Sequence, residues 1–230
     1  MKDAVADQRE TIKGTTSDYL LKADEVNSNV AYLRTKRLID IMGALIGLII
    51  LSPVFLIVMI LIKVEDPKGP IFFKQIRVGK DENQFYMYKF RSMVTDAEAL
   101  LKDLLALNEV SGAMFKMKED PRITRIGKFI RNSSIDELPQ LWNVLRGDMS
   151  LVGPRPPLVR EVDKYSSYDK QRLLVTPGCT GLWQATVRNS VGFQAMVQLD
   201  LEYIEKRSIQ FDLKLILLTI FALFSKKDAY

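Results

Sequence analysis

Residues 41–62 read IMGALIGLIILSPVFLIVMILI, and none of these residues carries a charge. About 20 apolar residues in a helix are enough to cross the hydrocarbon core of a bilayer. The stretch begins too far into the chain for a cleavable signal peptide, and no small-residue cleavage site follows it before Lys63. We therefore expect a membrane segment that stays attached to the protein.

A Ser52-Pro53 pair lies at the centre of this membrane segment. Proline lacks the backbone N–H and clashes with the preceding turn, so we expect a sharp bend at this point. The bend leaves carbonyl groups without partners at membrane depth. The Ser52 hydroxyl could bond one of them.

Basic residues flank the membrane segment on both sides. Those before it are Arg34, Lys36 and Arg37, and those after it are Lys63 and Lys68. Because cytoplasmic ends of membrane segments carry an excess of Lys and Arg, two basic ends favour a hairpin that enters one leaflet and returns. A proline-kinked helix that crosses the bilayer remains the alternative. Asp40, just inside the border, is expected to pair with Lys36 or Arg37 at helical spacing.

The composition of the 230-residue chain limits its chemistry. The chain has no histidine, which excludes His general bases and His metal ligands, so catalysis would use carboxylates or lysine. Its one cysteine, Cys179, can form neither an intrachain disulfide nor a thiolate metal site by itself, and we expect it to be a packing residue. The net charge of +5 favours an anionic partner, which could be phospholipid, nucleotide or nucleic acid.

The rest of the chain predicts an α+β fold that is mostly helical. Residues 71–78 and 84–93 are expected to form a small β-hairpin around the turn residues 79–83. The sequence predicts helices over residues 97–107, 126–131, 138–146, 161–175 and 194–206. The apolar stretch 211–224 is short for a membrane span, so we expect an interfacial or core helix. Residues 1–33 are mostly polar and are expected to form a loosely ordered tail.

Two adjacent carboxylates, Asp136 and Glu137, follow Ser134. Ser134 and Glu137 have the spacing of a capping box, so one interpretation is simply the start of a helix. Pro139 would then be the fifth helical residue, beyond the first-turn position that proline prefers. The other interpretation is chemical. Near a helix N-terminus the pair would stay ionised and could supply an anionic nucleophile and an oxygen ligand for Mg²⁺.

Basic residues elsewhere in the chain could meet phosphate groups. Arg122, Arg125, Lys128 and Arg131 recur at every third position, and Lys89 and Arg91 share one face of the second predicted strand. If the fold brings them to the carboxylates, Lys89 and Arg91 could neutralise a diphosphate. Either set could instead be ordinary solvated surface charge.

Three motifs carry a family resemblance. They are KFRSM at residues 89–93, SIDELPQLWNVLRGDMS at residues 134–150 and VGPRP at residues 152–156. Together with Ser52-Pro53 they are similar to the bacterial sugar transferases, the monotopic polyprenyl-phosphate phosphoglycosyltransferases. The resemblance runs from about residue 36 to residue 225.

The resemblance implies an architecture and a reaction. It implies a re-entrant membrane hairpin over residues 34–66 with its apex at Ser52-Pro53, and a membrane-associated catalytic domain over residues 67–230 on the cytoplasmic face of the bacterial inner membrane. The implied reaction moves a hexose-1-phosphate from a UDP-sugar to polyprenyl (undecaprenyl) phosphate through a covalent aspartyl-phosphosugar intermediate and releases UMP. This would be the first membrane step of polysaccharide or glycoconjugate assembly. The implied partners are these two substrates, membrane phospholipid and Mg²⁺, with no nucleic acid, and the oligomeric state stays open.

The resemblance also implies roles for individual residues. Asp136 resembles the family's nucleophile, Glu137 its metal-binding partner and Arg131 a phosphate-binding arginine. The substrate-binding residues are expected to be Lys89, Arg91, Arg131, Arg155, Arg188 and Asn189, with Arg155 on the nucleotide side. The sequence departs from the family pattern at Val187, where glycine usually precedes Arg-Asn, and at Cys179, where an apolar residue is usual.

Two other functions remain open. A non-catalytic module anchored in the membrane could bind anionic lipid through its basic residues, but it would not need the Asp136-Glu137 pair. A glycosyltransferase would move the sugar without its phosphate and would release UDP.

Overall fold

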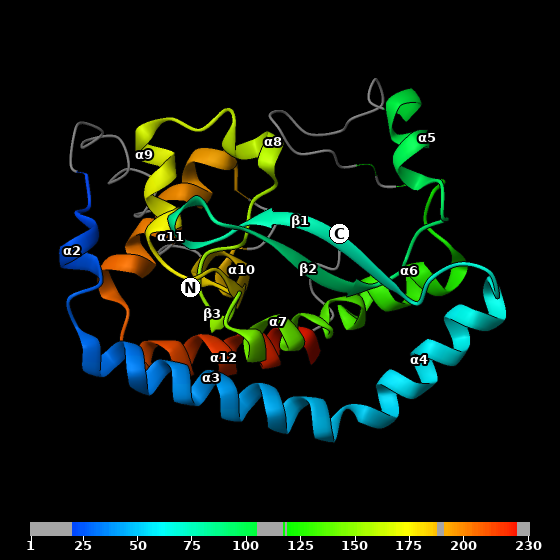
Figure 1. Ribbon diagram of the computed structural model, residues 1–230, viewed down its shortest axis with the longest axis horizontal. Helices are drawn as coiled ribbons and strands as arrows, with labels where there is room; N and C mark the ends of the chain where they lie inside the picture. The colour runs from blue at the N-terminus through cyan, green and yellow to red at the C-terminus, as the bar shows by residue number, and fades with distance from the viewer. Residues whose placement is uncertain (1–19, 105–116, 118, 188–190, 225–230) are drawn as a thin grey trace, which may run out of the picture.

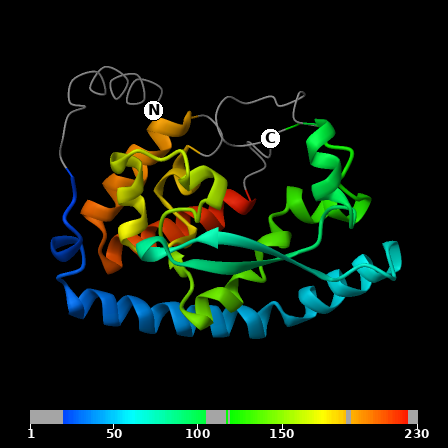
Figure 2. The same cartoon turned by 45° about the horizontal axis from the view of Figure 1, so that its top comes forward.

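A computed structural model describes residues 20–104, 117, 119–187 and 191–224 of the chain. Two helices, α3 (Val30–Ile50) and α4 (Ser52–Glu65), run along one side of the molecule, and the other elements lie together on the opposite side of this pair (Figures 1 and 2). The predicted α+β fold, mostly helical with a small β-hairpin, is confirmed.

The α3–α4 pair bends by 60° at Leu51. Pro53 lies in the first turn of α4, where a backbone N–H would have no acceptor within the helix, so the lack of one costs nothing. The Ser52 hydroxyl donates a 2.8 Å hydrogen bond to the carbonyl of Ile49. The predicted bend and the predicted role of Ser52 are therefore confirmed. No helix in the described ranges is by itself long and apolar enough to cross a membrane, whereas α3 and α4 together meet that criterion by length and composition.

Polar contacts fix α3 to the rest of the protein. Lys36 forms a buried 2.8 Å ion pair with Asp212 of helix α12 (Ile209–Phe224). The Asp40 carboxylate accepts hydrogen bonds from the Ser150 hydroxyl at 3.0 Å and from the Leu151 backbone N–H at 2.9 Å. Within the described residues Asp40 forms no direct ion pair with Lys36 or Arg37, because the packed domain supplies other partners, although the charge of Lys36 still favours ionised Asp40.

Two small sheets support the centre of the molecule. Strands β1 (Phe72–Val78) and β2 (Gln84–Phe90) form the predicted antiparallel hairpin, with the short 3-10 helix η1 (Lys80–Glu82) in the turn. A second sheet pairs β3 (Ser150–Val152) with β4 (Gly178–Thr180) in parallel. The sequence did not predict this sheet, because strands of three residues are too short to show an alternating pattern.

Seven further helices complete most of the fold. They are α2 (Ala23–Val26), α5 (Ala97–Leu104), α6 (Arg125–Asn132), α7 (Gln140–Arg146), α10 (Leu182–Thr186), α11 (Phe193–Lys206) and α12 (Ile209–Phe224). Helices α6, α7, α11 and α12 confirm their predictions to within about two residues, a normal uncertainty for helix ends. Helix α5 confirms the start of its prediction, and the predicted continuation to residue 107 lies outside the described residues.

The predicted helix over residues 161–175 is wrong. The segment breaks into α8 (Val159–Val162), α9 (Ser167–Lys170) and the 3-10 helix η4 (Gln171–Leu174). Ser166 and Asp169 cause the break, because the Ser166 hydroxyl accepts from the Asp169 N–H while the Asp169 carboxylate accepts from the Ser166 N–H. This reciprocal capping box starts a new helix inside the predicted one.

Apolar side chains form both a core and an exposed face. The largest core cluster lies where α11 and α12 pack on β3 and α10, and includes Val152, Leu182, Val197, Leu201, Ile204 and Leu215. Other large apolar side chains are exposed along α3, α4 and α12, namely Leu38, Met42, Leu45, Ile46, Ile49, Ile50, Leu56, Ile57, Ile60, Val64, Leu213, Leu217, Ile220 and Phe221. An exposed apolar surface of this extent indicates contact with a membrane or another protein.

Gly127 of α6 provides a test of how tightly α6 packs against the segment that follows β2. A Cβ at Gly127 would lie 1.9 Å from the carbonyl oxygen of Ser92, which is backbone and cannot rotate away. We expect Gly127→Ala to destabilise the fold by about 2 kcal/mol, because the clash outweighs the gain in helix propensity. Gly192→Ala is the matched control, since a Cβ there meets nothing within 4 Å. Thermal unfolding of both variants checks this, and an unchanged melting temperature for Gly127→Ala would contradict the packing described.

Candidate active site

A tight reversal of the chain carries the two carboxylates. Ser134 has a left-handed backbone with φ of 56° and makes no side-chain capping bond, and the 3-10 helix η3 (Ile135–Glu137) follows it. The capping-box interpretation of Ser134 is therefore wrong. Left-handed non-glycine residues cost roughly 1–3 kcal/mol and cluster at functional sites. The strain at Ser134 thus marks η3 as a candidate site.

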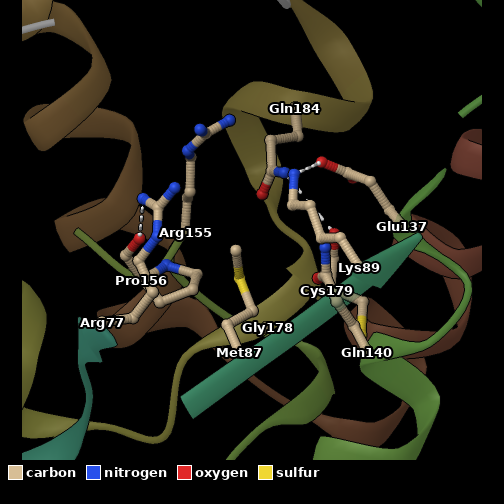
Figure 3. Close-up of a pocket in the computed structure, with 10 residues that line it drawn as sticks. All are labelled: Arg77, Met87, Lys89, Glu137, Gln140, Arg155, Pro156, Gly178, Cys179 and Gln184. Carbon is tan, nitrogen blue, oxygen red and sulfur yellow. Dashed lines mark hydrogen bonds and ion pairs between the residues drawn. The ribbon is translucent and has the colours of Figure 1, made fainter. Parts of the chain in front are cut away.

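Lys89 and Glu137 form a close ion pair in this site. The Lys89 ammonium on β2 lies 2.6 Å from a carboxylate oxygen of Glu137 on η3 (Figure 3). Burial opposes the charge on Glu137, but Lys89 and then Arg155 outweigh it and lower the pKa of Glu137. Glu137 is therefore held ionised.

Asp136 has the opposite electrostatic setting. Its side chain is only 8% exposed, and burial raises its pKa to about 6. The positive charges of Lys89 and Arg131 oppose that shift, and the neighbouring Glu137 adds to it. Two adjacent carboxylates with pKa values pushed in opposite directions are typical of groups with separate chemical roles.

The Lys89–Glu137 pair lines a cleft built from segments that are far apart in the sequence. Its lining residues are Arg77, Met87, Lys89, Glu137, Gln140, Arg155, Pro156, Gly178, Cys179 and Gln184. Figure 3 shows Arg77 and Arg155 on one side of the cleft and Lys89 with Glu137 on the other. Cys179 is at the cleft with its thiol pKa raised by burial, so it is a protonated packing group as expected. The cleft therefore joins Glu137 to a second end that carries the two arginines.

Only some of the other predicted site residues lie near the two carboxylates. Arg131 lies close enough to Asp136 for its positive charge to oppose the rise in the pKa of Asp136. Arg91 does not line the cleft and instead forms a 2.6 Å ion pair with Asp66, just after α4. Arg188 and Asn189 lie outside the described residues. Ser52 and Pro53 lie at the bend between α3 and α4.

The stripe of four bases before the carboxylates is not one surface. Arg122 is buried and pairs with Asp120 at 2.6 Å, whereas Lys128 is exposed and lies 3.7 Å from Glu119. Only part of the predicted stripe is therefore open to a phosphate or a lipid headgroup.

Sequence reasoning missed three polar residues of the cleft, Arg77, Gln140 and Gln184. Arg77 shares a strand face with Phe73 and Gln75, so strand alternation alone gave no sign that it would be buried. Gln140 and Gln184 face the cleft because of long-range packing. No local pattern distinguishes them from surface glutamines.

The donor atoms are compatible with Mg²⁺ only in a limited way. Within the described ranges, no group of three or more Cys, Asp or Glu side chains is placed to hold a metal ion. Mg²⁺ in enzymes is commonly held by one or two carboxylates together with substrate phosphates. The ionised Glu137, with Asp136 beside it, fits that type of site.

Comparison with known proteins places the chain in a family. The bacterial sugar transferase family matches residues 31–226. The chain is 53% identical over 191 residues to a galactosyl transferase, CpsE, of Streptococcus agalactiae, covering 83% of this chain and 42% of that protein. It is 42% identical over 199 residues to the UDP-galactose-lipid carrier transferase of Erwinia amylovora and to the undecaprenyl-phosphate galactose phosphotransferase of Salmonella typhimurium, covering 85% of this chain and 41% of each relative. The chain thus spans less than half the length of these curated relatives. From the family match over nearly all of its described length, we conclude that the chain belongs to the bacterial sugar transferase family.

Proposed function

We propose that this protein transfers a hexose-1-phosphate from a UDP-sugar to polyprenyl phosphate and releases UMP. The observation that carries the proposal is the Asp136-Glu137 pair with opposite pKa shifts, of which Glu137 lines, with Lys89, a cleft whose other side holds Arg77 and Arg155. The names of the relatives support it, since one uses a UDP-sugar and a lipid carrier and another is a phosphotransferase on undecaprenyl phosphate. The step would begin the assembly of a polysaccharide or glycoconjugate.

The proposed reaction has two displacements at phosphorus. The positive charges of Lys89, Arg131 and Arg155 offset the donor diphosphate, and the Asp136 carboxylate attacks the phosphorus that bears the sugar. The bond from that phosphorus to the UMP oxygen breaks, and an aspartyl phosphosugar forms. An oxygen of the polyprenyl phosphate then attacks the same phosphorus, which restores the Asp136 carboxylate and forms a polyprenyl diphosphate sugar. With a pKa of about 6, Asp136 is mostly ionised at neutral pH, as a nucleophile must be.

We further propose that Mg²⁺ takes part, held by Glu137 and the substrate phosphates. A bound ion would offset negative charge on the diphosphate. We expect a chelator to abolish sugar-phosphate transfer and added Mg²⁺ to restore it, since the described residues offer the ion no closed cage of their own. The assay is transfer with and without chelator, and the melting temperature without substrate serves as the control for folding. A full rate in excess chelator would count decisively against metal dependence.

The same proposal includes a re-entrant membrane hairpin at the cytoplasmic face of the inner membrane. Its support is the 60° bend, the exposed apolar side chains on both arms and on α12, and the basic residues at both ends of residues 41–62. Both arms lie on one side of the molecule (Figure 2). A donor from the cytoplasm and a carrier from the lipid would then meet at one interface, and such positioning is itself a large source of rate.

A single assay tests the proposed reaction against its alternatives. The full chain in detergent or nanodiscs is incubated with a UDP-sugar, Mg²⁺ and polyprenyl phosphate, and the released nucleotide is identified. We expect UMP, in equal amount to the lipid-linked sugar phosphate. UDP would indicate a glycosyltransferase that leaves the phosphate behind. No nucleotide from any of a panel of UDP-sugars would favour a non-catalytic lipid-binding module.

A further inference from the structure

Arg77 is a buried arginine at the cationic end of the cleft. It lies near the end of β1 and is only 5% exposed. One terminal nitrogen donates to the carbonyl of Pro156 at 3.0 Å, and the other donates to the side-chain oxygen of Gln75 at 2.7 Å. Both acceptors are neutral. The guanidinium is therefore hydrogen-bonded but not neutralised by these contacts.

Among the described residues, Arg77 forms no ion pair, and its buried Nε has no hydrogen-bond partner. Burial, together with the nearby charge of Arg155, lowers the pKa of Arg77 to about 10, while the charges of Glu161 and Glu137 oppose that shift, so the group is still charged at neutral pH. Buried charges in proteins are normally paired, because an isolated one loses its hydration without compensation. Arg77 thus carries a positive charge that no carboxylate of the described residues contacts directly, although Glu161 and Glu137 are near enough to act on it.

Arg172 shows what a purely structural arginine looks like in the same region. It is 2% exposed and donates to the carbonyl of Arg155, so it supports the same loop as Arg77. Its Nε lacks a hydrogen-bond partner as that of Arg77 does, but unlike Arg77 it forms a direct ion pair with the buried Asp200. Among the described residues, a carboxylate therefore contacts one buried arginine of this loop directly and does not contact the other.

A second buried group of the cleft also lacks a partner. The side-chain oxygen Oε1 of Gln184 has no hydrogen-bond donor among the described residues, and Gln184 lines the same cleft as Arg77 (Figure 3). A cleft that holds a buried cation without a directly paired carboxylate and an unused acceptor is suited to a ligand with both an anionic group and polar hydrogens.

We propose that Arg77 is a substrate-binding residue: its guanidinium receives the donor phosphate that leaves with the nucleotide. This rests on the proposed function, which makes the ligand a nucleoside diphosphate sugar. The orientation follows from the two ends of the cleft. The sugar-bearing phosphate must lie at Asp136 and Glu137, and Arg77 lies with Arg155 on the opposite side (Figure 3). The donor phosphate farther from the sugar then lies at Arg77, where it supplies an anion in direct contact with the guanidinium.

Binding of UDP to the full chain in nanodiscs, measured by calorimetry with Mg²⁺ present, tests this without turnover. We expect Arg77→Met to weaken UDP binding at least tenfold and Arg77→Lys, which keeps the charge but not the planar fork, to weaken it at least threefold. Arg160→Met is the matched control, because Arg160 is an exposed arginine near Arg77 that does not line the cleft. It should bind UDP within twofold of the unsubstituted protein.

Steady-state kinetics separate substrate binding from support of the loop. We expect both Arg77 variants to raise the KM for the UDP-sugar by factors similar to those for UDP, while the KM for polyprenyl phosphate changes less than twofold. If Arg77→Met does not fold, Arg77→Lys carries the test. Unchanged UDP affinity in a folded variant would overturn the inference, as would an equal rise in both KM values with a lower melting temperature. If the unsubstituted protein binds no UDP, the proposed function fails and this inference fails with it.

Discussion

Replacing Asp136 with asparagine should reduce sugar-phosphate transfer by a factor on the order of 10⁴ or more, because an amide has the shape of the carboxylate but cannot attack phosphorus. The loss should appear in kcat, since the amide still fills the same space beside Lys89. The variant should also fail to form a phosphosugar-enzyme adduct when it is mixed with labelled UDP-sugar in the absence of lipid acceptor. Trapping of that adduct in the unsubstituted protein is the direct measurement.

The melting temperature of Asp136→Asn serves as the control for folding, and the direction of the Asp136 pKa shift predicts it. Burial raises the pKa of Asp136 to about 6, so the folded protein disfavours the charged carboxylate relative to the unfolded chain. That penalty grows as the pH rises above the ordinary pKa of an aspartate. At pH 7.5 the neutral Asp136→Asn variant should therefore melt no lower than the unsubstituted protein. Asp163→Asn, at an exposed position outside the cleft, should leave both activity and melting temperature unchanged. Near-normal transfer by Asp136→Asn would reject Asp136 as the nucleophile.

Local signals explain which parts of the fold could be predicted from the sequence. Proline acts on its own backbone, so Ser52-Pro53 predicted the bend between α3 and α4 regardless of tertiary structure. The spacing of apolar residues likewise predicted α11 and α12, and strand alternation around Gly79 predicted the β1–β2 hairpin. Each of these features depends mainly on residues within one turn or one strand of each other.

The errors arise where distant residues decide the outcome. Asp40 and Lys36 have helical spacing, yet α3 packs against β3 and α12, whose Ser150 and Asp212 bind them instead. Ser134 has the right spacing for a helix cap, but the turn from α6 into α7 places it in a left-handed conformation. Spacing within one segment contains no information about such contacts.

The candidate site likewise has features that the local sequence predicts and features that depend on tertiary packing. Asp136 and Glu137 are adjacent in sequence, so their chemistry could be proposed from the motif that contains them. The burial that separates their pKa values, and the position of Lys89 2.6 Å from Glu137, depend on β2 packing against η3. Arg77 could not be identified from the sequence, because its significance lies in its burial without a directly paired carboxylate.

Thiol labelling distinguishes the two possible topologies of the α3–α4 pair, a re-entrant hairpin and a kinked span. Cysteines are introduced singly at Asp24, before α3, and at Lys68, after α4, because both positions are exposed. The background is Cys179→Ala, which removes the native thiol. In a re-entrant hairpin both ends are cytoplasmic, so a membrane-impermeant thiol reagent should label neither cysteine in intact cells and both after lysis. In a kinked span, one of the two would be labelled from outside.

Replacing Pro53 with leucine in the same backgrounds shows what maintains the hairpin. The substitution removes the steric cause of the bend and leaves an apolar segment long enough to cross the bilayer. We expect outside labelling of one end in part of the population, because the rest of the molecules keep α3 docked through Lys36–Asp212 and Asp40–Ser150. Adding Asp212→Asn, which removes the charge that pairs with Lys36, should increase the labelled fraction. If neither substitution changes the labelling, the topology does not depend on the proline, and the basic residues at the two ends of the segment, with the remaining contacts of α3, hold both ends on the cytoplasmic side.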